Sequence, residues 1–402
     1  MSRILLAWEL GTGFGHLGPF LGLVPRLLER GHTLHVAARE VAGAAQALGS
    51  LPVTLHQAPL CLNTYGGLQD PPLNFAEILM RYGSLEPALL QAMITAWRSL
   101  ISVVGADLVV ADHAPTALLA ARGTGVACAV LGSPFNVPPA VAPTPNMRAW
   151  ITVPAERLAD SDCRVLAVIN QVLPPDRGLH AIHEIFAGAG RFFSGVPELD
   201  PYVARQPDDY LGLQSLSTGT AAPVWTQGAG ERVFAYLHAD YSHIECALQA
   251  LAASGARVLV HVLGGGASLS EHYSNARLHF APQLLDFRRV VAECGLCVCH
   301  GNVGTTLGML QGGRPLLVLP KHLEHFLLGS AVERAGAGRV VHPDDKVPDI
   351  AGVLAAMLGD PAYGHHARTL AQRYAGSSVG TMTERAVARM EALFSQGAGP
   401  RS

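Results

Sequence analysis

The chain has few charged side chains, and this shortage limits the partners that it can bind. Asp, Glu, Lys and Arg make up 15% of its 402 residues, against about a quarter in a typical globular domain. The formal net charge is −3, so the chain has no surplus of basic residues for a polyanion. Nucleic acid is therefore not an expected partner.

Long apolar runs are also missing, although the mean hydropathy is positive at +0.27. No uninterrupted apolar stretch reaches the roughly 18 residues that a membrane-spanning helix requires. The apolar stretch at the N-terminus is interrupted by Glu9 and a glycine loop, which indicates a first strand and not a signal peptide. We expect no transmembrane segment and a cytoplasmic protein.

Paired cysteines are absent as well. The seven cysteines are odd in number and lack paired spacing, which is typical of a reducing compartment. Cys294, Cys297, Cys299 and His300 suggest a metal cluster at first sight. A second two-residue Cys pair is missing, and alternation along a strand puts Cys297 and Cys299 on one face. A metal site is therefore not expected.

The length and the alternation of strand and helix patterns predict an α/β protein with two domains. Residues 214–230 have the small, polar composition of a linker. We therefore predict an N-terminal domain over residues 1–213 and a C-terminal domain over residues 231–378. An amphipathic helix is expected within residues 379–402.

The most informative motif is the octapeptide from Cys299 to Thr306, Cys-His-Gly-Asn-Val-Gly-Thr-Thr. An apolar strand ends there in a glycine-broken turn that opens a helix, and such a turn presents backbone N–H groups and a partial positive charge. His300 and Thr305 add side-chain donors. The motif predicts a diphosphate ligand, although a His that only caps the strand is the alternative.

The neighbouring segments extend this site. Phe280-Ala281-Pro282-Gln283 offers an aromatic face for stacking and an amide that can read a base edge. Downstream, a buried strand over residues 316–319 is closed by Pro320, and Glu324-His325 begins a helix.

Taken in order, these motifs are similar to the donor-site signature of family-1 nucleotide-sugar glycosyltransferases, among them bacterial natural-product and macrolide enzymes and plant UDP-glycosyltransferases. The resemblance implies the GT-B fold, in which two Rossmann-like domains face across a cleft and a C-terminal helix crosses back to the N-terminal domain. It implies hexosyl transfer from a UDP- or dTDP-linked sugar, with the nucleotide sugar as co-substrate and no metal or other cofactor.

The resemblance also assigns donor-site residues. It places Phe280 and Gln283 at the base, His300, Gly301, Asn302, Gly304, Thr305 and Thr306 at the diphosphate, and Glu324 and His325 at the sugar.

Three positions depart from the family pattern: Asn302 replaces a usual Gly, Gly308 a ribose-binding Glu, and His325 a usual Gln. Loss of a ribose-binding carboxylate costs a ribonucleotide donor one charge-assisted hydrogen bond, about 1.5–3 kcal/mol. The loss costs a deoxythymidine donor less, which makes a dTDP-sugar a candidate. The charge of His325 is expected to vary near neutral pH.

The N-terminus reads as a βαβ unit whose glycine loop contains His16. Gly13, Gly15 and Gly18 match a dinucleotide fingerprint, with Glu40 past the second strand. The first strand ends near Trp8, however, too far before Gly13 for a pyrophosphate turn, so we do not favour this interpretation.

Gly-His-x-x-Pro at this place resembles the acceptor-side motif of the same family, which implies that His16 is the general base. The helix that follows should favour a neutral, proton-accepting imidazole. Asp112 ends a buried strand and is the candidate partner of His16. The alternative is that Asp112 caps the next helix, with His113 and Pro115 in the turn.

The acceptor is expected to be small and apolar or aromatic. The candidate lining residues are Phe75, Met80, Phe135, Met147 and Trp150, with ordinary core packing as the alternative for most of them. Two other protein classes remain open, namely an inactive binding protein with the same shell and a nucleotide-sugar epimerase.

Overall fold

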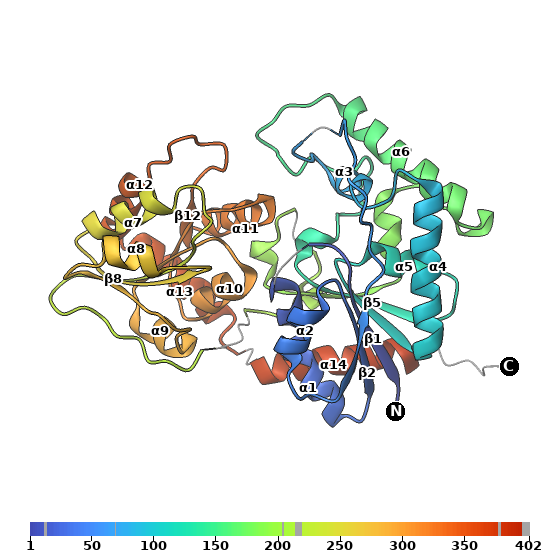
Figure 1. Ribbon diagram of the computed structural model, residues 1–402, viewed down its shortest axis with the longest axis horizontal. Helices are drawn as coiled ribbons and strands as arrows, with labels where there is room; N and C mark the ends of the chain where they lie inside the picture. Colours follow the sequence, from blue (N-terminus) through green and yellow to red (C-terminus); the bar gives the residue numbers. More distant parts are fainter. Residues whose placement is uncertain (12–13, 69, 203–204, 214–218, 377–378, 396–402) are drawn as a thin grey trace. The chain divides into compact units, whose positions relative to one another are not determined.

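The computed structural model shows two compact units (Figure 1) and describes residues 1–11, 14–68, 70–202, 205–213, 219–376 and 379–395. Unit 1 comprises Met1–Ser194, Gln206–Leu211 and Gly380–Ser402. Unit 2 comprises Gly195–Arg205 and Gly212–Val379.

Unit 1 is built on a parallel sheet in the order β3-β2-β1-β4-β5-β6. Its strands are β1 (Arg3–Trp8), β2 (Thr33–Ala38), β3 (Val53–Gln57), β4 (Leu108–Asp112), β5 (Ala127–Gly132) and β6 (Gly190–Phe193). Its helices are α1 (Leu17–Glu29), α2 (Val41–Leu48), α3 (Phe75–Met80), α4 (Pro87–Val104), α5 (Pro115–Ala121), α6 (Ala155–Val172) and α14 (Val379–Ser395). The short 3₁₀ turns η1 (Phe14–His16) and η2 (Pro134–Asn136) follow β1 and β5.

Unit 2 repeats the design, with a parallel sheet in the order β12-β11-β10-β7-β8-β9. Its strands are β7 (Arg232–His238), β8 (Arg257–Leu263), β9 (Leu278–Phe280), β10 (Leu296–Cys299), β11 (Leu316–Val318) and β12 (Gly338–Val340). Its helices are α7 (Ile244–Ala253), α8 (Ala267–Tyr273), α9 (Phe287–Glu293), α10 (Val303–Gln311), α11 (Leu323–Arg334), α12 (Ile350–Gly359) and α13 (Ala362–Arg373).

The two sheets have the same topology. In each, the first strand in sequence lies beside the fourth, so that the strand order reverses between β1 and β4 and between β7 and β10. Open parallel sheets bind ligands at the carboxyl ends of the strands at such a switch point. The predicted α/β class with two Rossmann-like domains is confirmed.

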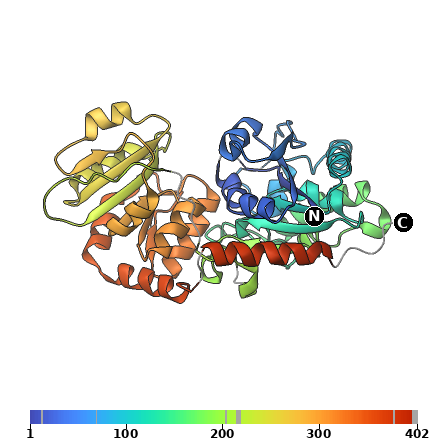
Figure 2. The ribbon, with the colours of Figure 1, turned by 90° about the horizontal axis from the view of Figure 1, so that it is seen from below.

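The core of unit 1 is closed by the last helix. Figure 2 shows α14 lying along the sheet, and its residues Ala386, Val387 and Met390 are buried in one cluster with Leu6 and Phe20. The amphipathic pattern of α14 therefore supplies one wall of an interior that begins with β1. The predicted return of the C-terminal helix to the N-terminal domain is confirmed.

The connection between the units is more interleaved than the predicted boundary at residues 213 and 214. Segment 195–205 packs with unit 2, where Val196 and Leu199 are buried and Glu198 accepts a hydrogen bond of 2.6 Å from the Tyr374 hydroxyl. Segment 206–211 returns to unit 1, where the Leu211 N–H donates to the Phe193 carbonyl at 2.8 Å.

The predicted linker over residues 214–230 is partly core. Residues 214–218 lie outside the described residues, whereas Trp225 is buried in unit 2 and its indole N–H donates to Glu293 at 2.8 Å. The small polar composition of the segment predicted a free linker, but one large aromatic side chain is enough to anchor it.

Helix α4 has the length and composition of a membrane span, with 18 residues and a mean hydropathy of 1.3. Leu90, Ile94, Trp97 and Ile101 recur at helical spacing and are buried in unit 1. A core helix with an apolar face passes the same composition test, and one third of α4 is buried in this way.

We predict that Met390→Ala destabilises unit 1 by about 2–5 kcal/mol, because it removes a fully buried side chain from the wall that α14 supplies. The measurement is urea unfolding followed by the fluorescence of Trp8 and Trp97, which are buried in unit 1. The exposed neighbour Ala388 provides the control Ala388→Ser, which should leave the midpoint unchanged. Equal midpoints for both variants would contradict the assignment.

Candidate active site

His16 and Asp112 meet at the switch point of the unit 1 sheet. Asp112 is the last residue of β4 and lies beside Trp8, the last residue of β1. His16 ends the η1 turn that leads into α1, and its Nδ1 lies 3.3 Å from Asp112 Oδ1. The Asp112 side chain is 2% exposed and the His16 side chain 12% exposed. The predicted juxtaposition of these two residues is therefore present in the structure.

In the first turn of α5, which Asp112 would cap in the alternative interpretation, a different carboxylate accepts a backbone hydrogen bond. Glu9 Oε2 accepts the Thr116 N–H at 3.0 Å in the first turn of α5. Burial raises the pKa of Glu9 to about 7, against the opposing effect of its hydrogen bonds in that turn. Local sequence patterns do not predict this role of Glu9, since Glu9 and Thr116 are 107 positions apart.

The loop that carries His16 is tied to the end of β4. The Leu10 N–H donates to the His113 carbonyl at 2.9 Å, and the Trp8 indole N–H donates to the Leu10 carbonyl at 2.9 Å. The Trp8 ring stacks on the His16 imidazole with 5.4 Å between the ring centroids. These contacts fix the imidazole against the carboxylate.

Two glycines leave room for the pair. Gly11 has φ +78°, and a Cβ there would lie 2.1 Å from His16 Nε2. Gly132 ends β5 with φ +99°, and a Cβ there would lie 2.9 Å from Asp112 Oδ1. Any side chain at either position would displace the dyad, and positive φ also favours glycine there. The sequence signal for this role of Gly132 is weak, because it consists of the position of the glycine at the end of a strand.

Two further residues border the dyad. Asn136 in η2 donates from Nδ2 to Asp112 Oδ1 at 3.0 Å. His113 has φ +47°, and it is the non-glycine residue with positive φ among the residues that the structure describes. Burial and the neighbouring His16 hold the pKa of His113 well below its usual value, so His113 is neutral.

In unit 2, the turn after β10 has the form that the motif predicts. Gly301 has φ +90°, and a Cβ there would lie 2.8 Å from the His325 carbonyl oxygen. Asn302 precedes α10 without a side-chain cap bond, which leaves the N–H groups of the first turn without that partner. A Cβ on Gly304 would meet nothing within 4 Å, so this turn is open at Gly304.

His300 differs from its predicted role as a phosphate donor. Its Nδ1–H donates to the Leu319 carbonyl at 2.7 Å, and its Nε2 accepts the His238 N–H at 2.9 Å. The ring is fully buried, and this burial lowers its pKa to about 4. In this geometry the neutral imidazole connects the ends of β7, β10 and β11 and has no N–H left for a ligand. The alternative of a His that caps the strand describes it better.

Other predicted donor residues are divided between the interior and the surface. Thr306 is fully buried, whereas Asn302 and Thr305 are half-buried. Phe280 is 8% exposed and packs in the core of unit 2, so little of its ring remains for base stacking. Gln283 is exposed. The accessible part of the motif is thus the backbone turn with Asn302 and Thr305.

The predicted sugar-binding pair lies at the start of α11. Glu324 is half-buried in the first turn, and His325 is buried. Burial and the neighbouring His322 lower the pKa of His325 to about 2. The expectation that the charge of His325 varies near neutral pH is therefore wrong, because a buried imidazole among other imidazoles stays neutral.

A pocket of about 260 Å³ lies in unit 2 at the carboxyl ends of β7, β11 and β12. Asp240 and Lys321 pair at its edge, and Tyr241, His243, His342 and Pro348 contribute to its walls. The pocket is polar and small.

The candidate acceptor residues are mostly part of the interior. The buried residues among them match the alternative of core packing, namely Phe75, Met80, Phe135 and Met147. Trp150 is half-buried and lies under the Arg148 guanidinium, 5.7 Å from its ring centroid.

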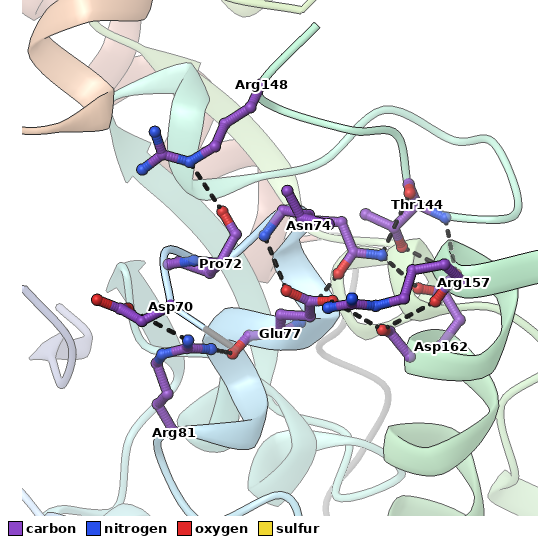
Figure 3. A network of polar contacts seen from close by, with 11 residues as sticks. Asp70, Pro72, Asn74, Glu77, Arg81, Thr144, Arg148, Arg157 and Asp162 are labelled. Carbon is purple, nitrogen blue, oxygen red and sulfur yellow. Dashed lines mark hydrogen bonds and ion pairs between the residues drawn. The ribbon is translucent and has the colours of Figure 1, made fainter. Parts of the chain in front are cut away.

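A buried polar network fixes the same region (Figure 3). Glu77 accepts hydrogen bonds from Arg157 at 2.7 Å and from the Leu73 N–H at 2.9 Å. Asp162 accepts the Thr144 N–H at 2.7 Å. The network joins α3, the 144–148 segment and α6, so that these segments of unit 1 form one connected frame.

No known family model matches the chain. It is 27% identical over 196 residues to a PGL/p-HBAD biosynthesis rhamnosyltransferase of Mycobacterium tuberculosis, a match that covers 48% of the chain and 44% of the relative. The chain thus spans about half the length of that relative. It is 24% identical over 303 residues to a PGL/p-HBAD biosynthesis glycosyltransferase of the same organism, covering 71% of each. It is 39% identical over 82 residues to the elloramycin glycosyltransferase ElmGT of Streptomyces olivaceus, covering 20% of each.

Solved structures align over nearly the whole chain. The calicheamicin glycosyltransferase CalG4 aligns with a TM-score of 0.71 and 18% identity, covering 99% of each chain. The glycosyltransferase VinC in complex with dTDP aligns with a TM-score of 0.67 and 16% identity, covering 98% of this chain and 100% of VinC. The chain therefore has the fold of these glycosyltransferases, and the GT-B fold that the resemblance of its motifs implies is confirmed.

Proposed function

We propose that the protein is an inverting glycosyltransferase that moves a sugar from a UDP- or dTDP-linked donor to a hydroxyl of a small apolar acceptor. The observation that carries the proposal is the hydrogen bond between His16 and Asp112 at the switch point of the unit 1 sheet. Curated glycosyltransferases among the relatives support sugar transfer. An inactive binding protein would have no need of this buried dyad.

His16 is the general base in this mechanism. The Asp112 carboxylate accepts the Nδ1–H, which fixes the tautomer and leaves the Nε2 lone pair as the proton acceptor. Gly11 keeps the space beside Nε2 free of a side chain. A positioned general base of this kind accelerates a reaction by about 10²–10⁴-fold.

The reaction is a direct displacement at the anomeric carbon. His16 Nε2 takes the proton of the acceptor hydroxyl as its oxygen forms the new bond to that carbon. The bond from the carbon to the diphosphate oxygen breaks, and the nucleoside diphosphate leaves from the opposite face, which inverts the configuration. The proposed chemistry uses no metal ion, since the N-terminus of α10 is the group that favours the departing charge.

We infer that the donor is a dTDP-sugar in preference to a UDP-sugar. Gly308 offers no carboxylate to a ribose 2′-hydroxyl, and it is buried within α10. VinC was solved in complex with dTDP, and a second structural neighbour, the Streptomyces glycosyltransferase SsfS6, was solved with the same nucleotide. Glu324 is the candidate contact for the sugar hydroxyls. The names of relatives and neighbours, which refer to elloramycin, calicheamicin and spinosyn, support a natural-product acceptor.

We predict that His16→Ala lowers kcat at least about a hundredfold, because it removes the proton acceptor. The assay measures nucleoside diphosphate release from dTDP- and UDP-sugars in the presence of a panel of phenols and aliphatic alcohols. Nucleotide affinity, measured by calorimetry, should be unchanged. Turnover equal to that of the wild type would remove the base assignment.

A second prediction concerns the turn at α10. Gly304→Asp places a negative charge in the first turn, which stabilises the helix but repels a diphosphate. Since a side chain at Gly304 meets no neighbouring atom, the variant should fold with unchanged or higher thermal stability. Its affinity for dTDP should fall at least about tenfold, given the size of such charge effects.

The matched control for that prediction is Gly304→Ala, which adds the Cβ without the charge and should keep its nucleotide affinity. Calorimetric titration with dTDP and UDP gives both the effect of the charge and the preference between the two nucleotides. Stronger binding of UDP than of dTDP would count against the donor inference. Unchanged dTDP affinity in Gly304→Asp would show that the diphosphate lies elsewhere.

A further inference from the structure

We propose that Asn136 is a positioning residue of the catalytic centre, and that it extends the dyad into a chain of three side chains, His16, Asp112 and Asn136. The inference rests on the proposed function, because it concerns the same base. It assigns a role to a residue that touches neither His16 nor the reacting atoms directly. Its action passes through Asp112.

The three side chains come from the ends of three neighbouring strands. His16 follows β1, Asp112 ends β4, and Asn136 follows β5 in the η2 turn. Asp112 Oδ1 is the common acceptor, since it lies 3.3 Å from His16 Nδ1 and 3.0 Å from Asn136 Nδ2. The chain of hydrogen bonds thus runs along the carboxyl edge of the sheet.

The orientation of the Asn136 amide follows from this contact. An ionised carboxylate only accepts hydrogen bonds, so the amide must turn its NH₂ group, and not its oxygen, toward Asp112. In this orientation, the amide oxygen of Asn136 is buried and has no hydrogen-bond partner among the residues that the structure describes. Asn136 is 3% exposed, and burying an amide oxygen without a hydrogen-bond donor lowers the stability of the fold. This cost indicates that the bond from Asn136 to Asp112 serves a function other than stability.

Backbone hydrogen bonds hold Asn136 next to the Asp112 carboxylate. Ser133 Oγ accepts the Phe135 N–H at 3.3 Å, and the Ser133 carbonyl accepts the Asn136 N–H at 3.1 Å. These bonds hold η2 in a fixed position directly after Gly132. Because Gly132 has no side chain, the end of β5 can approach Asp112 closely enough for the amide to reach Oδ1.

The chemical consequence concerns the orientation and the charge of Asp112. Two donors on one oxygen stabilise the ionised carboxylate and prevent its rotation away from His16. Oδ1 then always faces Nδ1–H, and Nε2 keeps its lone pair toward the acceptor. Without the amide, Oδ1 loses one of these two donors, and a smaller fraction of molecules has the productive geometry.

The first test needs no substrate. In ¹H NMR spectra of protein labelled with ¹⁵N-histidine, the His16 Nδ1–H gives a downfield signal that His16→Ala removes. In Asn136→Ala this signal should move downfield or broaden, because Oδ1 loses its competing donor. Asn170→Ala is the control, since Asn170 is an exposed Asn of unit 1 whose amide, among the described residues, hydrogen-bonds to the backbone of Leu179 and has no bond to Asp112. The control should leave the signal in place.

The second test is kinetic and uses the assay described for His16. Asn136→Ala should lower kcat about tenfold or more through misorientation of the base, while dTDP affinity stays unchanged. Asn136→Asp is close in shape but can donate to Asp112 only when protonated. Its rate relative to the wild type should therefore rise as the pH falls, which a loss of stability alone would not produce.

The outcomes separate the two proposals. A wild-type protein that transfers no sugar overturns the proposed function, and this inference with it. An active wild type whose His16 signal and kcat are both unchanged in Asn136→Ala overturns the inference alone. If Asn136→Ala unfolds, the pH dependence of Asn136→Asp decides, and a constant ratio to the wild type across pH is the contrary result.

Discussion

The burial of one carboxylate organises the first unit. Asp112 is 1% exposed, and an ion removed from water in this way is tolerated only when hydrogen-bond donors replace the lost hydration. The donors come from the segments after β1 and β5, which therefore converge on the end of β4. Gly132 leaves room for the carboxylate, and Gly11 leaves room for the His16 ring that bonds to it. The arrangement of three loops follows from the need to satisfy one charged group.

The two sheets have the same topology, but the histidines at their switch points have different partners. Each sheet places a histidine near the point where the strand order reverses, His16 in unit 1 and His300 in unit 2. His16 hydrogen-bonds to a carboxylate through Nδ1, and Nε2 is the nitrogen that takes the proton in the proposed mechanism. Both ring nitrogens of His300 form hydrogen bonds to backbone groups, and these bonds connect the ends of three strands. The chemistry of an imidazole at a switch point thus depends on its partners more than on its place in the fold.

Local patterns predicted the strand ends well, and with them the fold and the meeting of His16 with Asp112. The period of apolar residues locates β1 and β4, and adjacent parallel strands bring their carboxyl ends together. The same patterns could not show that Glu9 caps α5, that His300 is saturated by backbone groups, or that Trp225 anchors a segment of linker composition. Each of these depends on contacts between residues far apart in the chain.

The crossing of the chain between the units has a consequence for biosynthesis. Unit 1 contains β1 near the start of the chain and α14 near its end, with unit 2 inserted between them. During translation the first sheet emerges from the ribosome long before the helix that covers one of its faces, while unit 2 is already whole when that helix is made. The half that is synthesised first is therefore the half that completes its interior last.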